Sequence, residues 1–359
     1  MTIAVLTSGV ALGVHVPGLL LARRLTEAGV PVRVDVLEDH LPRRQRDLIP
    51  ASKVAFHRDF RVALAGQRLA GRNAAALEED SVDVLLAEWE ADQVDLVVVL
   101  SGFWLPTVHR YASRHAGVRV HSCHVDAVAS PSFESKASQV PESGPPPYAH
   151  EDVWLLEEAG GTVARTIPVS RAEPVPWVER NGRLLTHGGG WGMGTYRSRA
   201  ADLGGEGFSL DVVAYEGADV AAHDGRHRYF MIDPSWHPWH DRGFPPFGRI
   251  EDGRVDYRRR EDHHDGFDLT REAVAVVSKP GGGTLMDSLA SATPVVLLEP
   301  FGGHESLNAR LWERLGFGIP YDDWARTGKS FSVLERLHRN LVAARARTLS
   351  YPDLLATSR

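Results

Sequence analysis

A chain of 359 residues is long enough for two domains with complete cores, although its length alone does not require two. The formal net charge of −7 and the pI of about 6.2 argue against a nucleic-acid partner, and the single cysteine, Cys123, excludes an internal disulfide framework. No apolar run approaches bilayer length and the chain opens directly on a strand pattern, so we expect a cytoplasmic protein for which membrane contact is not a feature. Abundant Ala, Arg and Gly with little Lys are typical of a GC-rich bacterial genome.

The start of the chain predicts the opening of a parallel α/β sheet. The apolar run 3–6 is the first expected strand, 7–18 a loop, 19–28 a helix and 32–37 the next strand. His15 lies in the loop, and a histidine is a suitable base for removing a proton from a hydroxyl or amine because its ordinary pKa lies near neutrality. The alternative is a loop histidine that only contacts ligand or solvent.

Residues 39–92 are predicted to be mainly helical and are locally basic. Such a surface can meet an anionic ligand or membrane headgroups. We favour a solvated helical surface, because acidic residues are interspersed among the arginines and no exposed aromatic cluster is evident. An apolar strand is expected next, at 94–100.

A polar cluster of His121, Cys123, His124 and Asp126 follows the strand predicted at 118–120. Its spacing matches no closed zinc pattern, so we expect no metal there. His124 and Asp126 are expected to line a cleft, where an aspartate can hold the tautomer of a histidine and raise its basicity. This pair is the second candidate for the base.

The division of the chain follows from two segments of loop composition. A Ser- and Pro-rich stretch at 130–147 predicts a long surface loop. Residues 174–182 predict the linker between a first domain, 1–173, and a second domain, 183–345. Residues 346–359 form a tail.

The second domain opens with a strand at 183–187, followed by Gly188, Gly189 and Gly190 and by a helix from about Tyr196. A glycine turn between a strand and a helix lets backbone N–H groups approach a phosphate closely. A flexible turn is the alternative. We consider it less favourable because a second glycine cluster falls at an equivalent position of the sheet.

That second cluster lies between a strand at 273–277 and a helix, and another strand follows at 295–298. The residues expected to hold a diphosphate are Ser278, Gly281, Gly282, Gly283 and Thr284. Thr284 and Asp287 also fit an ordinary helix cap, so a purely structural explanation is available. The last helix of the stretch carries Glu305 and Asn308.

At these residues the stretch resembles the donor-binding half of GT-B glycosyltransferases, in the branch with the lipid I N-acetylglucosaminyltransferase and the diacylglycerol glycosyltransferases. Those proteins carry a Ser/Thr-Lys-x-Gly-x-x-Thr-x-x-Glu run, a proline-ended strand, and an acidic or Gln residue shortly before Asn-Ala. The counterparts here are Ser278, Lys279, Gly281, Thr284, Asp287, Pro300, Glu305, Asn308 and Ala309.

The resemblance implies roles for these positions. Residues 281–284 would face the diphosphate, Asp287 the nucleoside ribose and Glu305 the hydroxyls of the donor sugar. Asp287 departs from the family's Glu and is one methylene shorter. In the first loop the family's histidine position falls on Val14, so that His15 is displaced by one residue.

The same resemblance places a nucleobase pocket just before residue 273, where Phe247 or a neighbouring aromatic could stack on the base. A local aromatic minicore is the equal alternative. We expect His263, His264 and Asp265 to be solvated loop residues, and the tail 346–359 to cross back to the first domain.

Together these patterns predict an α/β protein of the GT-B fold, with two doubly wound, Rossmann-like domains facing a central cleft. The expected activity is inverting, metal-independent transfer of a sugar from a UDP-sugar, without a further cofactor. The expected acceptor is a small soluble natural-product intermediate of antibiotic biosynthesis, such as a nucleoside or aminoglycoside precursor. A lipid glycosyltransferase at the membrane surface, a sugar-nucleotide epimerase and a catalytically silent nucleotide-binding partner remain alternatives.

Overall fold

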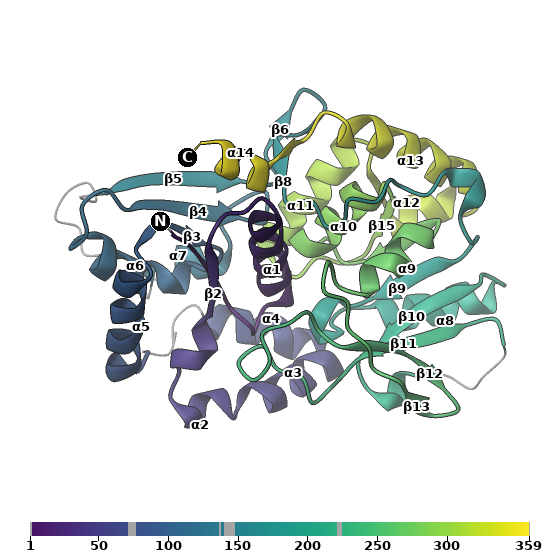
Figure 1. The fold of residues 1–359 in the computed structure, drawn as a ribbon. Helices are drawn as coiled ribbons and strands as arrows, with labels where there is room; N and C mark the ends of the chain where they lie inside the picture. Colours follow the sequence, from purple (N-terminus) through teal and green to yellow (C-terminus); the bar gives the residue numbers. More distant parts are fainter. Residues whose placement is uncertain (1, 71–76, 136–137, 140–147, 221–224, 359) are drawn as a thin grey trace.

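The structure is a computed structural model that describes residues 2–70, 77–135, 138–139, 148–220 and 225–358. It contains a five-stranded sheet in the order β2-β1-β3-β4-β5 and an eight-stranded sheet in the order β13-β12-β11-β10-β9-β14-β15-β16 (Figure 1). We call each sheet, together with the chain segments that connect its strands, a unit. The first unit holds the five-stranded sheet, and the second unit holds the eight-stranded sheet.

The elements have the following bounds. The strands are β1 (Thr2–Thr7), β2 (Val32–Val36), β3 (Val94–Val99), β4 (Arg119–His124), β5 (Ala149–Trp154), β6 (Glu158–Ala159), β7 (Thr162–Val163), β8 (Arg165–Thr166), β9 (Leu184–His187), β10 (Leu210–Ala214), β11 (Arg228–Ile232), β12 (Phe247–Glu251), β13 (Arg254–Val255), β14 (Ala275–Ser278), β15 (Val295–Leu297), β16 (Gly318–Pro320) and β17 (Leu349–Ser350). The α-helices are α1 (Leu12–Glu27), α2 (Arg43–Arg46), α3 (Ile49–Arg58), α4 (Phe60–Ala70), α5 (Glu79–Ala91), α6 (Leu105–Ala112), α7 (Pro131–Glu134), α8 (Tyr196–Gly205), α9 (Gly266–Glu272), α10 (Gly282–Ser291), α11 (Gly303–Arg314), α12 (Tyr321–Arg326), α13 (Phe331–Arg345) and α14 (Tyr351–Thr357). Short 3₁₀ helices are η1 (Leu37–His40), η2 (Gly102–Trp104), η4 (Trp177–Glu179), η5 (Gly189–Trp191) and η6 (Gly217–Asp219).

The buried apolar runs form the centres of both sheets. The strands predicted at 3–6 and 94–100 are confirmed as β1 and β3, and those predicted at 183–187 and 273–277 as β9 and β14. All pairs in the five-stranded sheet are parallel, as are the pairs from β11 to β16 across the second sheet. Continuous apolar strands suit such sheets because helices cover both faces.

The loop predicted at 7–18 is wrong, because α1 already begins at Leu12. No capping side chain marks this start and Pro17 lies inside the helix, so the sequence there lacks the usual start signal. Tertiary contacts compensate for the missing signal. The first turns of α1 pack against η5 and α10 of the second unit.

The other differences between the predicted and the observed elements lie outside the central strands of the two sheets. Residues 228–255 contain β11, β12 and β13, which the aromatic-rich sequence did not predict, and β12 and β13 are antiparallel. The surface loop predicted at 130–147 begins with the short helix α7. Residues 136–137 and 140–147 of that loop lie outside the described residues.

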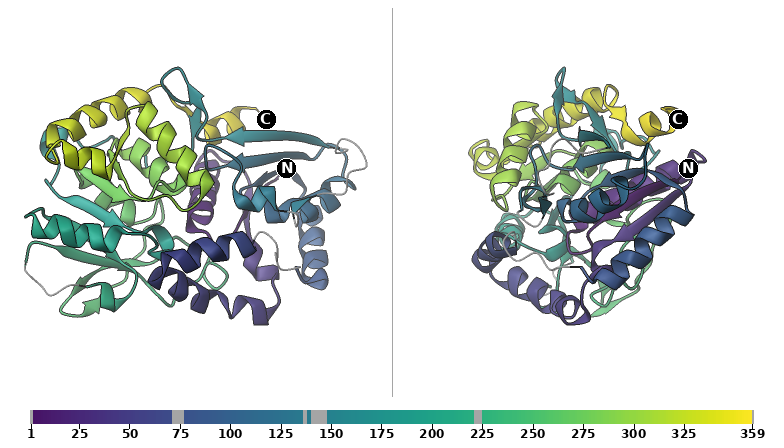
Figure 2. Two further views of the ribbon diagram at one scale, coloured as in Figure 1. Left: turned by 180° about the vertical axis from the view of Figure 1, so that it is seen from behind. Right: turned by 90° about the vertical axis from the view of Figure 1, so that its left-hand side faces the viewer.

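The end of the chain lies on the first unit. Helix α14 packs against α1, and β17 pairs with β8. Both chain ends are therefore on the same half of the molecule, as Figures 1 and 2 show. Tyr351 and Leu355 belong to the same buried cluster as Ile3 of β1. The linker predicted at 174–182, which contains η4, remains a prediction of the domain boundary.

Candidate functional site

A cavity of about 660 Å³ lies between the two units, where the carboxyl ends of their parallel strands meet. The first unit contributes the ends of β1, β2 and β4, and the second unit contributes the ends of β9 and β14. Open α/β sheets bind ligands at this edge. We call the two sides of the cavity the first wall and the second wall, after the unit that supplies each.

The second wall contains both predicted glycine clusters side by side, because β9 and β14 are paired. A Cβ atom on Gly189 would lie 3.5 Å from Lys279 Cε, which shows how closely the two turns approach. Helix α10 begins at Gly282 and directs its unpaired N–H groups and the positive end of its dipole toward the cavity. Backbone N–H groups beside a lysine form a suitable site for a diphosphate.

Most of the predicted donor residues do line this cavity. They are Gly188, Gly189, Gly190, Gly281, Gly282, Gly283, Thr284, Asp287 and Glu305. Gly282 also contacts the first unit so closely that an added Cβ atom would lie 2.2 Å from the Val125 carbonyl oxygen. A side chain at Gly282 would therefore disturb the contact between the units as well as any ligand.

Two predicted donor residues do not line the cavity. Ser278 is buried and donates a hydrogen bond to the His187 carbonyl oxygen at 2.9 Å. Asn308 is also fully buried, and its side chain joins the two units. Its Oδ1 accepts from Ala127 N at 2.8 Å, while its Nδ2 donates to Asp126 Oδ1 at 2.7 Å and to the Pro280 carbonyl oxygen at 3.0 Å.

The acidic residues of the second wall already have partners. Glu305 forms an ion pair with Lys279 and accepts a hydrogen bond from Phe301 N at 2.6 Å. Asp287 Oδ1 lies 3.1 Å from His264 Nε2. Burial lowers the pKa of His264, but the carboxylate of Asp287 outweighs this effect and the pKa is raised overall.

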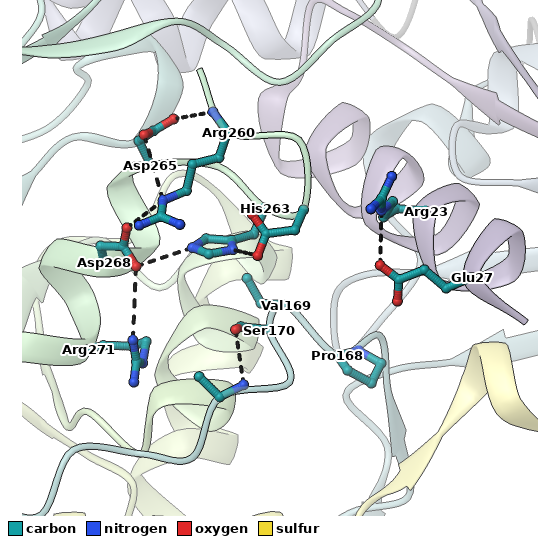
Figure 3. Close-up of polar contacts among 12 residues, drawn as sticks. Arg23, Glu27, Pro168, Val169, Ser170, Arg260, His263, Asp265, Asp268 and Arg271 are labelled. Atoms are coloured by element: carbon teal, nitrogen blue, oxygen red, sulfur yellow. Dashed lines mark hydrogen bonds and ion pairs between the residues drawn. The ribbon is translucent and has the colours of Figure 1, made fainter. Parts of the chain in front are cut away.

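The expectation that His263 and His264 are solvated is wrong. His264 lines the cavity, and His263 is buried with its ring nitrogens 2.7 Å from Asp262 and 3.2 Å from Asp268. Figure 3 shows His263 directed at Asp268, which also faces Arg260 and Arg271. The charged run before α9 suggested a surface loop, although these charges pair with one another.

An apolar part of the second wall adjoins the Asp287–His264 pair. Leu185, Val213, Ile232 and Phe247 line it from the sheet, and Phe247 stacks on Phe230 with ring centroids 5.7 Å apart. A slot of this kind, beside polar side chains and a helix start, suits the flat ring of a nucleobase.

The first wall is mainly apolar, lined by Leu12, Val14, Val16, Leu37, Leu41 and Phe103, among others. Two carboxylates interrupt it. Glu38 is buried and accepts from Ser8 Oγ, Gly9 N and Val10 N at 2.7, 2.6 and 3.1 Å, so that it holds the turn after β1. Asp126 is the other, and its Oδ1 accepts the hydrogen bond from Asn308.

The position of His15 does not support a role as base. Its side chain is fully buried on α1 and does not line the cavity, whereas the neighbouring Val14 does. His15 Nδ1 lies 3.1 Å from Thr7 Oγ1, and Nε2 has no partner. Burial and the nearby Lys53 cation lower the pKa of His15 to about 3.

The predicted pair of His124 with Asp126 is not formed. His124 Nε2 lies 3.0 Å from Asp152 Oδ1, and its ring stacks on Trp154 at a centroid distance of 3.8 Å, away from the cavity. Burial lowers the pKa of His124. Asp126 lines the cavity but His124 does not, and burial raises the pKa of Asp126. A carboxylate with a raised pKa is a better base than an ordinary one.

Sequence reasoning missed His304, which lines the cavity from the first turn of α11. The sequence feature that could have identified His304 is its position directly after the glycine turn Gly302–Gly303. Among the described residues, no group of three or more His, Cys, Asp or Glu side chains is arranged to hold a metal ion, and His121 and Cys123 form no such group. Within those same residues no helix has the length and apolar character needed to span a bilayer.

Comparisons with known proteins give structural relatives only. Neither a family model nor a curated protein sequence matches the chain. The glycosyltransferase SsfS6 of Streptomyces sp. SF2575, complexed with thymidine diphosphate, is similar over 100% of this chain and 99% of its own, with 18% identity and a TM-score of 0.57. The spinosyn rhamnosyltransferase SpnG is similar over 99% of both chains, with 14% identity and a TM-score of 0.58. MurG of Acinetobacter baumannii is similar over 99% of this chain and 98% of its own, with 14% identity and a TM-score of 0.51. With two α/β units facing a cavity and full-length likeness to these structures, the chain has the GT-B fold, as its sequence predicted.

Proposed function

We propose that the protein is a glycosyltransferase that moves a sugar from a nucleoside diphosphate sugar to a largely apolar acceptor. The observation that carries the proposal is the second wall, where two glycine turns, the start of α10 and Lys279 converge on one cavity. These groups supply the positive potential that a diphosphate needs. The likeness to glycosyltransferases, one of them complexed with thymidine diphosphate, supports the same ligand class.

The first wall sets the proposed acceptor class. Its apolar side chains favour an acceptor with apolar rings or chains over the polar nucleoside or aminoglycoside precursor that the sequence suggested. The donor nucleoside is proposed to be thymidine or uridine, whose single-ring base matches the slot beside Phe247.

The proposed reaction proceeds with inversion and needs no metal for charge stabilisation. Asp126 removes the proton of an acceptor hydroxyl, and the acceptor oxygen forms a bond to the anomeric carbon. The bond between that carbon and the diphosphate oxygen breaks as the new bond forms. The departing diphosphate carries the electron pair, and its charge is stabilised by Lys279 and the α10 N–H groups.

A calorimetric titration with UDP, TDP, GDP and ADP, without added metal, tests the proposal. We expect selective binding of TDP or UDP, followed by transfer from the matching sugar nucleotide to apolar acceptors. Failure of all four to bind would contradict the donor site. Tight binding without turnover would instead favour a catalytically silent partner, and release of a 2-epimer would favour an epimerase.

A further inference from the structure

His57 is a first-unit residue whose side chain is buried in the second unit. It lies in the last turn of α3, and its ring contacts two groups across the boundary between the units. Nδ1 is 2.7 Å from the Gly192 carbonyl oxygen, and Nε2 is 3.2 Å from Asp219 Oδ1. The side chains of His57 and Asp219 both have an exposed fraction of 0%.

Both ring nitrogens of His57 face groups that accept hydrogen bonds. A carbonyl oxygen can only accept, so Nδ1 must carry a proton. Asp219 Oδ2 accepts from Tyr215 N and Glu216 N at 2.8 and 3.1 Å, and Oδ1 also accepts from Arg197 at 3.0 Å. Burial acts to raise the pKa of Asp219, but the hydrogen bond from His57 and the two backbone N–H bonds lower it overall, so Asp219 is ionised. Each ring nitrogen of His57 therefore lies against an acceptor of the second unit.

The carbonyl that His57 holds belongs to the glycine turn of the second wall, residues 188–194. Gly192 has a φ of 58°, and a Cβ atom there would lie 2.7 Å from His57 Nδ1, so only glycine fits. Within the turn, Gly192 N donates to the Gly189 carbonyl oxygen at 3.0 Å. On the opposite side, Gly189 N donates to His187 Nδ1 at 3.1 Å, and burial lowers the pKa of His187 to about 4. Two histidines therefore hold the turn from its two sides.

We propose that His57 is a positioning residue that fixes the shape of the diphosphate-binding glycine turn when the two units dock. The inference rests on the proposed function, because it assumes that the turn binds the donor. The side chain that contacts the Gly192 carbonyl oxygen comes from α3 of the first unit. The turn therefore acquires its final shape only when α3 is in place. The side chain itself does not line the cavity.

The charged and titratable groups that face His57 or its acceptors are Asp219, Glu216, Arg197, Arg58, Tyr196 and Tyr215. Burial raises the pKa of Tyr215 to about 12 and that of Tyr196 still higher, so neither tyrosine changes charge near neutral pH.

Two variants of His57 separate its two hydrogen bonds. In His57→Asn the amide nitrogen lies close to the position of Nδ1 and can still donate to Gly192. In His57→Gln it lies close to the position of Nε2 and can donate only to Asp219. We expect the Kd for thymidine diphosphate to rise about tenfold in His57→Gln and less than threefold in His57→Asn at pH 6. Arg58→Gln, which removes the exposed ion pair with Glu216 across the same boundary, is the matched control and should change the Kd less than twofold.

The difference between the two His57 variants distinguishes positioning of the turn from general support of the boundary. Equal effects of the two variants would overturn the inference while leaving the donor site intact. Failure of the wild type and of Arg58→Gln to bind UDP or TDP would overturn the proposed function instead. If one His57 variant does not fold, the other still decides: a Kd of His57→Gln equal to that of the wild type, or a Kd of His57→Asn that is about tenfold higher, would overturn the inference.

Discussion

The two walls of the cavity present polar groups in opposite ways. The second wall offers backbone N–H groups and charged side chains that already have partners, such as Lys279 with Glu305 and His264 with Asp287. The first wall offers apolar side chains interrupted by the carboxylates of Glu38 and Asp126. A wall built from backbone and fixed pairs suits a ligand of constant shape, such as a nucleoside diphosphate. An apolar wall distinguishes between ligands mainly by their shape. It also leaves very few groups, here the two carboxylates, to carry out acid–base chemistry.

The largest effect should come from the first wall. Asp126→Asn keeps an oxygen that can accept from Asn308 but removes the proposed base, so we expect kcat to fall by about 10²–10⁴ with little change in donor affinity. The base must be deprotonated to act and burial raises its pKa, so wild-type kcat/KM should rise with pH through a limb above the ordinary carboxyl range. Asp126→Asn should lack that limb.

His15→Gln is the control for that measurement, because it alters a buried side chain outside the cavity. Its turnover per folded molecule should stay within severalfold of the wild type. Near-normal turnover in Asp126→Asn together with a large loss in His15→Gln would return the role of base to the histidine.

The second wall should respond in affinity instead. Gly283→Asp places a carboxylate in the first turn of α10, where an added Cβ atom meets only Gly13 Cα at 3.5 Å. A negative charge there is compatible with the helix, but it repels a diphosphate, so we expect the Kd for thymidine diphosphate to rise by about 10²-fold. Calorimetry measures the change.

Gly283→Asn is the matched control, with the same shape and no charge. Its Kd should stay within a few fold of the wild type. If both variants weaken binding equally, space rather than charge limits the site. If neither does, the diphosphate does not bind at the start of α10. Gly282 is unsuitable for this test because it has no room for a side chain.

The walls also differ in how much of them the sequence predicts. Glycine turns that directly follow strands are local features, so residues 188–190 and 281–283 were identified without any knowledge of the other unit. The pair of His264 with Asp287 joins residues 23 positions apart, and the charged run around His264 suggested a solvated loop. The partner of a buried polar group depends on packing that no local pattern records.

The first wall shows this limit most clearly. Helix α1 begins at Leu12 without a capping side chain, so a histidine expected on a loop is instead turned into the core. His124 and Asp126 are close in sequence, but β4 directs His124 toward Asp152 while Asp126 faces the cavity. Val14 lines the cavity whereas His15 does not, and Asp126 lies beyond the end of β4, so residue type and spacing do not determine which side chain lines a site.

Asn308 connects the two walls, and its substitution should have an intermediate effect. Asn308→Asp keeps the acceptor for Ala127 N but replaces two donated hydrogen bonds, to Asp126 and to the Pro280 carbonyl oxygen, with repulsion between acceptors. We expect the free energy of unfolding to fall by about 2–4 kcal/mol, measured by urea denaturation at pH 8.

The loss should be smaller at pH 5, because a protonated carboxyl group can donate again. Leu307→Asp adds the same charge on the more exposed neighbouring position of α11 and should cost less than about 1 kcal/mol. Equal destabilisation by the two variants at both pH values would show that charge on α11, rather than the bridge to the first wall, matters.

The smallest effect should come from the rim, where the units meet in solvent. Arg242 lies 3.1 Å from Asp39 across the boundary, and its side chain is 63% exposed. An exposed pair gains little because water screens both charges and two side chains lose freedom, so Arg242→Ala should change the free energy of unfolding by no more than about 0.5 kcal/mol. The Kd for thymidine diphosphate should also be unchanged. A larger loss of unfolding free energy, matched by the loss that 0.5 M salt causes in the wild type, would mean that charge at the rim holds the units together. In that case buried contacts such as those of Asn308 and His57 would not be what docks the two units.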